Sequence, residues 1–140
     1  MRRIISLDIG EARIGVAMSD PLGFFAQGVT VLKAKEDWLP QLKEIVDKND
    51  ADTLLIGLPV RTNGTEGPEA EKMRGVADMI KQYFPDVKIV FWDERFTTTI
   101  AQQALLEADV SRAGRKQSVD KIAATLLLQS YLDRERTQPR

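Results

Sequence analysis

Residues 6–20, SLDIGEARIGVAMSD, combine two apolar runs with a turn that begins at a glycine. Residues 3–9 are rich in β-branched side chains, which is typical of a buried strand, and residues 14–18 indicate a second strand directly after the turn. The first glycine suits the turn itself, and Gly15 suits a close approach of another backbone. The stretch therefore predicts a β-hairpin with one carboxylate, Asp8, near the end of its first strand.

The apolar periodicity of the remaining chain predicts further strands and helices. We expect strands at residues 28–33, 53–57 and 87–92. Helices are expected at residues 37–48, 69–83, 99–108 and 119–132. Ser118 is expected to cap the last helix after a polar, basic loop over residues 109–117. The order predicts an α/β fold, in which a mixed five-stranded sheet (three antiparallel strands plus two parallel) has helices on both faces. We predict a single domain over residues 1–135 and a flexible tail over residues 136–140.

The composition narrows the chemistry open to this chain. Its 140 residues include no cysteine and no histidine, which excludes disulfides, thiol nucleophiles, Cys/His zinc sites and histidine acid–base catalysis. A bound metal would have only oxygen ligands, which favours Mg²⁺ or Mn²⁺. The net charge of −1 argues against a protein that binds nucleic acid through overall charge alone. Apolar runs are too short for a signal peptide or a membrane span, so we expect a cytoplasmic protein.

Acidic side chains are expected at the ends of three elements. Asp8 is near the end of the first strand, Asp93 and Glu94 follow the last strand, and Asp120 lies in the first turn of the final helix. Binding sites in open sheets form beyond the carboxyl ends of parallel strands. Two alanines one turn after Asp120 would let the final helix lie close to the sheet and bring Asp120 to the same edge. Such a cluster needs cations, and two Mg²⁺ ions about 4 Å apart would neutralise it and activate water for hydrolysis.

Each acidic residue also has a purely structural interpretation. Asp8 fits a turn former. The Asp93–Glu94 pair fits solvated loop charges or residues that complement a helix dipole, and Asp120 fits a dipole residue two positions after a cap. The joint occurrence of these acids at element ends favours a functional site.

Four segments carry a resemblance to a known family: LDIGEARIGVAMSD, IGLPVRTNGTEGP, WDERFTT and SVDKIAATLLLQSYL. Their content and order resemble the YqgF/RuvX family, whose fold is ribonuclease H-like, over about residues 3–133. That family is associated with nuclease action on pre-16S rRNA, and was earlier proposed to resolve Holliday junctions by analogy with RuvC. The resemblance implies a ribonuclease H-like fold and a metal-dependent nuclease that hydrolyses phosphodiester bonds.

The resemblance also implies roles for individual residues. The catalytic carboxylates would be Asp8, Glu94 and Asp120, with Asp93 as a further metal ligand beside Glu94. Together they would hold two divalent ions, Mg²⁺ or Mn²⁺, which would activate the attacking water.

Basic residues indicate where nucleic acid would bind. Residues 112–140 contain seven basic and three acidic side chains, a local excess that favours a phosphate backbone. The candidate contacts are Arg13, Arg61, Arg95, Arg112, Arg115 and Lys116. Arg95 fits an ion pair with a neighbouring acid equally well. The partner would be precursor rRNA or, alternatively, branched DNA, and the protein would be a monomer or a homodimer.

The residues leave four functions open. The leading one is a nuclease that processes the 5′ end of pre-16S rRNA. A Holliday junction resolvase would use the same chemistry on four-way DNA junctions, and a twofold dimer would favour it. The DIG segment and its hairpin also resemble the phosphate-binding start of actin-like ATPases and sugar kinases, but 140 residues supply only one such domain. A non-catalytic binding module is disfavoured because clustered carboxylates hinder phosphate binding unless they hold metal.

Overall fold

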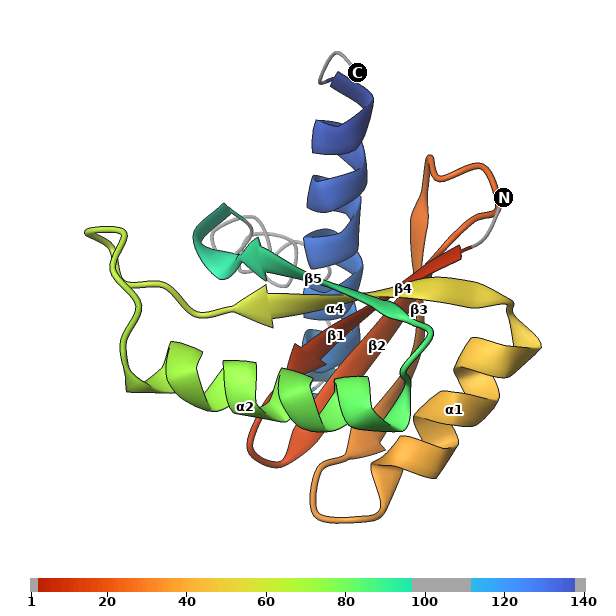
Figure 1. The fold of residues 1–140 in the computed structure, drawn as a ribbon, viewed down its shortest axis with the longest axis horizontal. Coiled ribbons are helices and arrows are strands. Elements are labelled where there is room, and N and C mark those ends of the chain that lie inside the picture. The colour runs from red at the N-terminus through yellow and green to blue at the C-terminus, as the bar shows by residue number, and fades with distance from the viewer. Residues whose placement is uncertain (1–2, 97–111, 138–140) are drawn as a thin grey trace.

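The computed structural model describes residues 3–96 and 112–137, and this part of the chain is built on one mixed sheet (Figure 1). Its strands are β1 (Arg3–Ile9), β2 (Arg13–Ser19), β3 (Ala26–Lys33), β4 (Ala51–Leu58) and β5 (Lys88–Asp93). Their spatial order is β3-β2-β1-β4-β5. The β3–β2 and β2–β1 pairs are antiparallel, and the β1–β4 and β4–β5 pairs are parallel. The predicted five-stranded sheet with three antiparallel strands plus two parallel ones is confirmed.

Helices cover both faces of the sheet, as predicted. α1 (Trp38–Lys48) and α2 (Pro68–Tyr83) lie on one face, and α4 (Arg112–Thr137) crosses the other (Figure 1). Each face has its own apolar core, because the buried side chains form two separate clusters. The larger cluster lies under α1 and α2, and the smaller one lies under α4.

Side chains of β1 alternate between these two cores, as a strand requires. Ile5 and Leu7 are fully buried in the core under α1 and α2. Ser6 points to the opposite face, where its hydroxyl donates a hydrogen bond of 2.8 Å to the carbonyl of Ala124 in α4. The same alternation directs Asp8 to the α4 face. The carboxyl ends of β1, β4 and β5 share one edge of the sheet, so this edge is where the site must be sought.

The C-terminal helix differs from the sequence prediction. α4 begins at Arg112, so the prediction of a loop up to residue 117 and a cap at Ser118 is wrong for residues 112–118. Arginine, lysine, alanine and glutamine are good helix formers, and in this segment they outweigh a single glycine. The helix expected over residues 99–108 lies outside the described residues. In the described ranges, none of the helices has the length and apolar character needed to cross a membrane.

Candidate active site

Asp8 lies at the carboxyl edge of the sheet, one residue before the end of β1. Glycines flank it on both neighbouring strands: Asp8 pairs with Gly15 on β2, and Gly57 is next in register on β4. Because neither glycine has a side chain, groups from other elements can reach Asp8 on the α4 face. Burial, and then the negative charge of Asp120, raise the pKa of Asp8 from 3.8 to about 6.

Asp120 approaches Asp8 because α4 lies directly on Gly15. A Cβ atom at position 15 would overlap the main-chain carbonyl of Asp120, so any larger residue would push the helix away. The Asp120 carboxylate accepts a hydrogen bond of 2.8 Å from Nε of Arg13. Ala124, one of the alanines expected to face the sheet, is fully buried. The final helix therefore does bring its acidic residue to the edge that Asp8 occupies.

Glu94 reaches the same place from the other side. It begins the short helix η1 (Glu94–Phe96) directly after β5. Its side chain lies over Gly57, where a Cβ atom would stand 2.6 Å from Oε1 of Glu94 and 2.7 Å from Cδ1 of Leu127. Burial, followed by the charges of Asp8 and Asp93, raises the pKa of Glu94 from 4.5 to about 7. Asp8 thus interacts electrostatically with Glu94 on one side and with Asp120 on the other.

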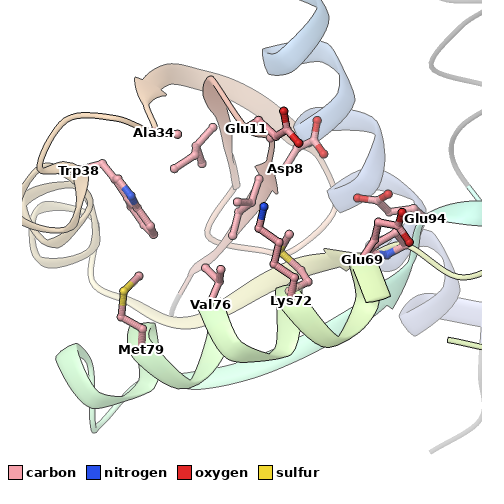
Figure 2. A pocket seen from close by; sticks show the side chains of 14 residues that line it. Asp8, Glu11, Ala34, Trp38, Glu69, Lys72, Val76, Met79 and Glu94 are labelled. Carbon is pink, nitrogen blue, oxygen red and sulfur yellow. The ribbon is translucent and has the colours of Figure 1, made fainter. Parts of the chain in front are cut away.

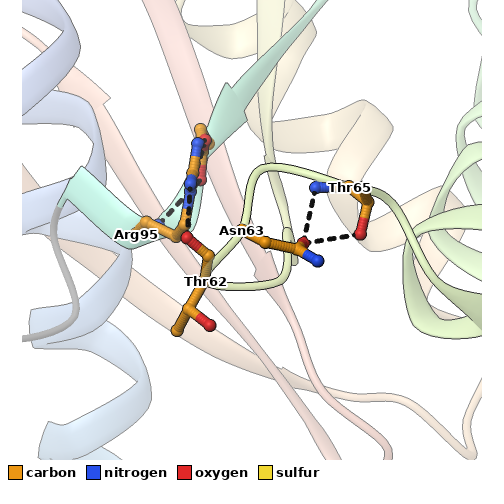
Figure 3. A network of polar contacts seen from close by, with 5 residues as sticks. Thr62, Asn63, Thr65 and Arg95 are labelled. Carbon is orange, nitrogen blue, oxygen red and sulfur yellow. Dashed lines mark hydrogen bonds and ion pairs between the residues drawn. The ribbon is translucent and has the colours of Figure 1, made fainter.

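Asp93 forms an ion pair with Arg95. Nε and Nη2 of Arg95 donate hydrogen bonds of 2.9 and 2.6 Å to Oδ2 of Asp93, and Nε also lies 3.1 Å from Oδ1. These bonds hold the pKa of Asp93 below its ordinary value. Nη1 of Arg95 donates to the carbonyl of Thr62 over 3.3 Å, which ties the loop after β4 to the end of β5 (Figure 3). Of the two interpretations of Arg95, the structure contains the ion pair.

The loop after β4 is closed by its own hydrogen bonds (Figure 3). Oδ1 of Asn63 accepts hydrogen bonds from the main-chain N–H and the hydroxyl of Thr65, at 3.1 and 2.7 Å. Gly64 has a φ of 89°, a left-handed conformation that glycine adopts without strain. The exposed guanidinium of Arg61 lies against Gly67, directly before α2. The loop therefore holds Arg61 beyond the carboxyl end of β4.

Two basic residues that the sequence analysis missed lie next to Arg13. Lys33 is opposite Arg13 in the β2–β3 register, so both side chains leave the same face of the sheet. Arg13, Lys33 and Lys35 line a pocket of about 380 Å³. The strand pairing was the signal that could have revealed them. The described side chains do not include three other candidate contacts: Arg112, Arg115 and Lys116.

The chemistry of the carboxylates suits a divalent cation as ligand partner. All the donors are oxygens, and positive charge beside Asp8 and Glu94 would offset the burial and repulsion that raise their pKa values. Within residues 3–96 and 112–137, no three acidic side chains already converge into a metal site. The Asp120 carboxylate is held in the ion pair with Arg13.

A pocket of about 490 Å³ opens beside the same carboxylates (Figure 2). Asp8 and Glu94 are part of its lining, together with the β1–β2 hairpin, Pro59 after β4 and one side of α2. The pocket was not predicted from the sequence, because its walls come from segments that are distant in the chain.

Comparison with known proteins identifies close relatives. The RuvX family model, described as "Holliday junction resolvase", matches residues 2–134. A Clostridium botulinum protein named "Putative pre-16S rRNA nuclease" is 51% identical over 133 residues, which cover 94% of this chain and 96% of that protein. A Clostridium acetobutylicum protein of the same name is 50% identical over 133 residues, covering 94% of this chain and 98% of that protein.

Solved structures share the fold at low identity. Fowlpox virus resolvase with Holliday junction DNA has a TM-score of 0.60 and 13% identity, over 95% of this chain and 98% of that one. T. thermophilus RuvC with a Holliday junction substrate has a TM-score of 0.59 and 13% identity, over 98% of both chains. The ribonuclease H-like fold expected from the sequence is confirmed by these likenesses.

Proposed function

Because this chain belongs to the RuvX family, we propose that it is a metal-dependent nuclease that hydrolyses phosphodiester bonds at the 5′ end of precursor 16S rRNA. The observation that carries this proposal is the position of Asp8, which interacts with both Glu94 and Asp120 at an edge kept open by glycines. The names of relatives that are about half identical support RNA as the substrate. Such a substrate places the protein in the cytoplasm.

Asp8, Glu94 and Asp120 are the residues that would hold two divalent ions, Mg²⁺ or Mn²⁺. When bound, such ions neutralise the carboxylates, activate water and stabilise charge on the leaving oxygen. Asp8 lies between the other two acids and is the natural shared ligand. Asp93 is proposed as a further metal ligand beside Glu94, and both its oxygens also accept hydrogen bonds from Arg95.

The substrate backbone would lie along the basic side chains next to Asp120. Arg13, Lys33 and Lys35 line one pocket with Glu36, and this excess of basic side chains is where phosphates that flank the cleaved bond would bind. Arg61 would contact the same substrate from the loop after β4. Residues 112–116 would extend the cationic surface at the start of α4, through Arg112, Arg115 and Lys116.

A Holliday junction resolvase is the second candidate. The description of the family model favours it, and the two structural neighbours named above hold junction DNA. Their identity of 13% supports a common fold and leaves the substrate open. Symmetric cleavage of a junction would require a twofold dimer, whereas RNA trimming needs only a monomer.

The test compares two substrates under matched conditions. Purified protein is incubated with a precursor 16S rRNA fragment and with a four-way DNA junction, each with Mg²⁺, Mn²⁺ or EDTA. We expect metal-dependent cleavage of the RNA, and loss of cleavage with retained binding for Asp8→Asn. Cleavage of the junction alone would overturn the RNA assignment. Full activity of Asp8→Asn would overturn the metal-site assignment, cleavage in EDTA would overturn the metal dependence, and cleavage of neither substrate by wild type would overturn the nuclease itself.

A further inference from the structure

The pocket beside the carboxylates extends well past the site of hydrolysis. Asp8 and Glu94 contribute to its lining, and its far part lies between the β1–β2 hairpin, the start of α1 and α2 (Figure 2). Most of its lining is apolar: Ile9, Ile14, Ala34, Trp38, Pro59, Met73, Val76 and Met79. A phosphate group needs neither this volume nor this apolar surface, so another part of the substrate is the better occupant.

We propose that this pocket binds an unpaired nucleobase of the substrate, adjacent to the phosphodiester bond that the carboxylates attack. The inference rests on the proposed nuclease function. It adds that the protein recognises the base of the nucleotide beside the cleaved bond.

The size and the walls of the pocket fit a base. A volume of about 490 Å³ lies within the usual range of sites for small organic molecules, and a single nucleotide falls in that class. Met73 and Met79 project from α2, and thioethers are polarisable groups that make favourable contacts with aromatic rings. Trp38 is 8% exposed, so its ring closes the pocket as a wall and is not a free stacking platform.

The charges at the pocket favour a base over a second phosphate. Glu11 and Glu69 line the pocket together with the two carboxylates at its end, and Lys72 is the cation in this lining. Four carboxylates against one lysine would repel a polyanionic backbone. Carboxylate oxygens can instead accept hydrogen bonds from the exocyclic amino group of a base, and Lys72, which extends from α2 into the pocket (Figure 2), can donate to a ring nitrogen or carbonyl.

Under the proposed function the backbone would lie along Arg13, Lys33 and Lys35, which line a different pocket from the one that Asp8 and Glu94 line. A nucleotide whose base enters the pocket must therefore unstack that base from its neighbours. Base pairing in a duplex opposes this unstacking. Single-stranded ends, loops and bulges meet that requirement at low cost, because their bases are already splayed. The pocket thus selects an unpaired nucleotide at the cleaved position.

A binding experiment tests the pocket without relying on catalysis. Methionine methyl groups labelled with ¹³C report on only four positions, of which Met73 and Met79 line the pocket and Met18 lies in the core. We expect adenosine 5′-monophosphate with Mg²⁺ to shift the methyl signals of Met73 and Met79 and to leave that of Met18 in place. Ribose 5-phosphate, which has the same sugar and phosphate but no base, should shift neither pocket signal. Equal shifts with both compounds, or no shift with the nucleotide, would overturn the proposal.

A cleavage experiment tests the same pocket through matched variants of α2. Met79 and Tyr83 are 43% and 41% exposed on this helix, and only Met79 lines the pocket. Met79→Lys should raise the KM for single-stranded RNA roughly tenfold, the usual scale of one lost base contact. Tyr83→Lys adds the same charge outside the pocket and should leave KM unchanged. Because Tyr83→Lys measures the effect of the added charge by itself, equal KM values in Met79→Lys and Tyr83→Lys would contradict the pocket.

The two proposals fail in different ways. If wild type cleaves neither substrate, the nuclease assignment is wrong, and if Asp8→Asn still cleaves RNA, the metal-site assignment is wrong. In both cases the methyl titration still decides whether the pocket takes a base. If Asp8→Asn is inactive while neither the methyl signals nor the KM values respond, the nuclease assignment stands and the base pocket is wrong.

Discussion

Replacing Asp8 with asparagine should stabilise the metal-free protein at the pH at which it acts. Burial and the charge of Asp120 raise the pKa of Asp8 from 3.8 to about 6, so the fold favours the protonated carboxyl. This contribution to stability is fully present below pH 3.8 and is lost as the pH rises through 6. At about 1.4 kcal/mol per pKa unit, the ionised form costs the fold about 3 kcal/mol at pH 8. Asparagine stays neutral and avoids that cost.

The assay is urea unfolding of wild type and Asp8→Asn in EDTA, at pH 5 and pH 8. We expect the variant to be more stable by about 3 kcal/mol at pH 8 and by about half of that at pH 5, where wild-type Asp8 is largely protonated in the fold. In thermal unfolding the pH 8 difference corresponds to a rise in Tm of roughly 6–12 °C. Asp78→Asn, at an exposed position on α2, is the matched control and should show no such pH dependence.

Two outcomes would refute this reasoning. A variant that is less stable than wild type at both pH values would mean that Asp8 makes favourable contacts in its charged form. A stability gain that is the same at pH 5 and pH 8 would mean that the gain comes from packing and not from relief of charge.

Further predictions concern the glycines, the metal and Arg13. Gly57→Ala places a methyl group 2.6 Å from Oε1 of Glu94 and should lower kcat roughly 10- to 100-fold, whereas Gly75→Ala, with open space around it on α2, should leave kcat unchanged. Mg²⁺ should raise the Tm of wild type more at pH 8 than at pH 5.5, because the carboxylates must be ionised to bind it, and equal shifts would contradict the site. Arg13→Gln removes the cation paired with Asp120, so the Mg²⁺-induced rise in Tm should grow; a smaller rise would show that Arg13 orients Asp120 for binding.

The sequence predicted the sheet well because its signals are local. The β-branched run of β1, the apolar runs of β4 and β5 and the turn between β1 and β2 each lie within a few residues. Together they indicate the strands and the β1–β2 hairpin, whereas the strand order comes from the structure. Asp8, Glu94 and Asp120 were expected at one edge, and in the structure the charge of Asp8 interacts with that of Glu94 and with that of Asp120, while their catalytic roles stay a prediction.

The parts that sequence could not supply depend on register and on side-chain conformation. Gly57 makes room for Glu94 only because β4 pairs in parallel with β1 in one particular register. Arg95 could pair with Asp93 or with a phosphate, depending on its side-chain conformation. Residue types alone do not determine that conformation. The start of α4 was misjudged because a run of basic residues with one glycine fits a loop and a helix equally well.

The described acids whose pKa departs from its ordinary value fall into two groups, one with lowered and one with raised pKa values. Asp20 sits in the β2–β3 turn. Although desolvation alone would raise its pKa, hydrogen bonds from the main-chain N–H groups of Phe25 and Phe24 lower it, and Arg95 lowers the pKa of Asp93 in the same way. These carboxylates stabilise the fold when charged, as turn formers and ion pairs should. Asp8 and Glu94 have raised pKa values and destabilise it when charged. A turn former or a dipole residue would belong to the first group, so the raised pKa values of Asp8 and Glu94 favour a cation-binding site over a purely structural role.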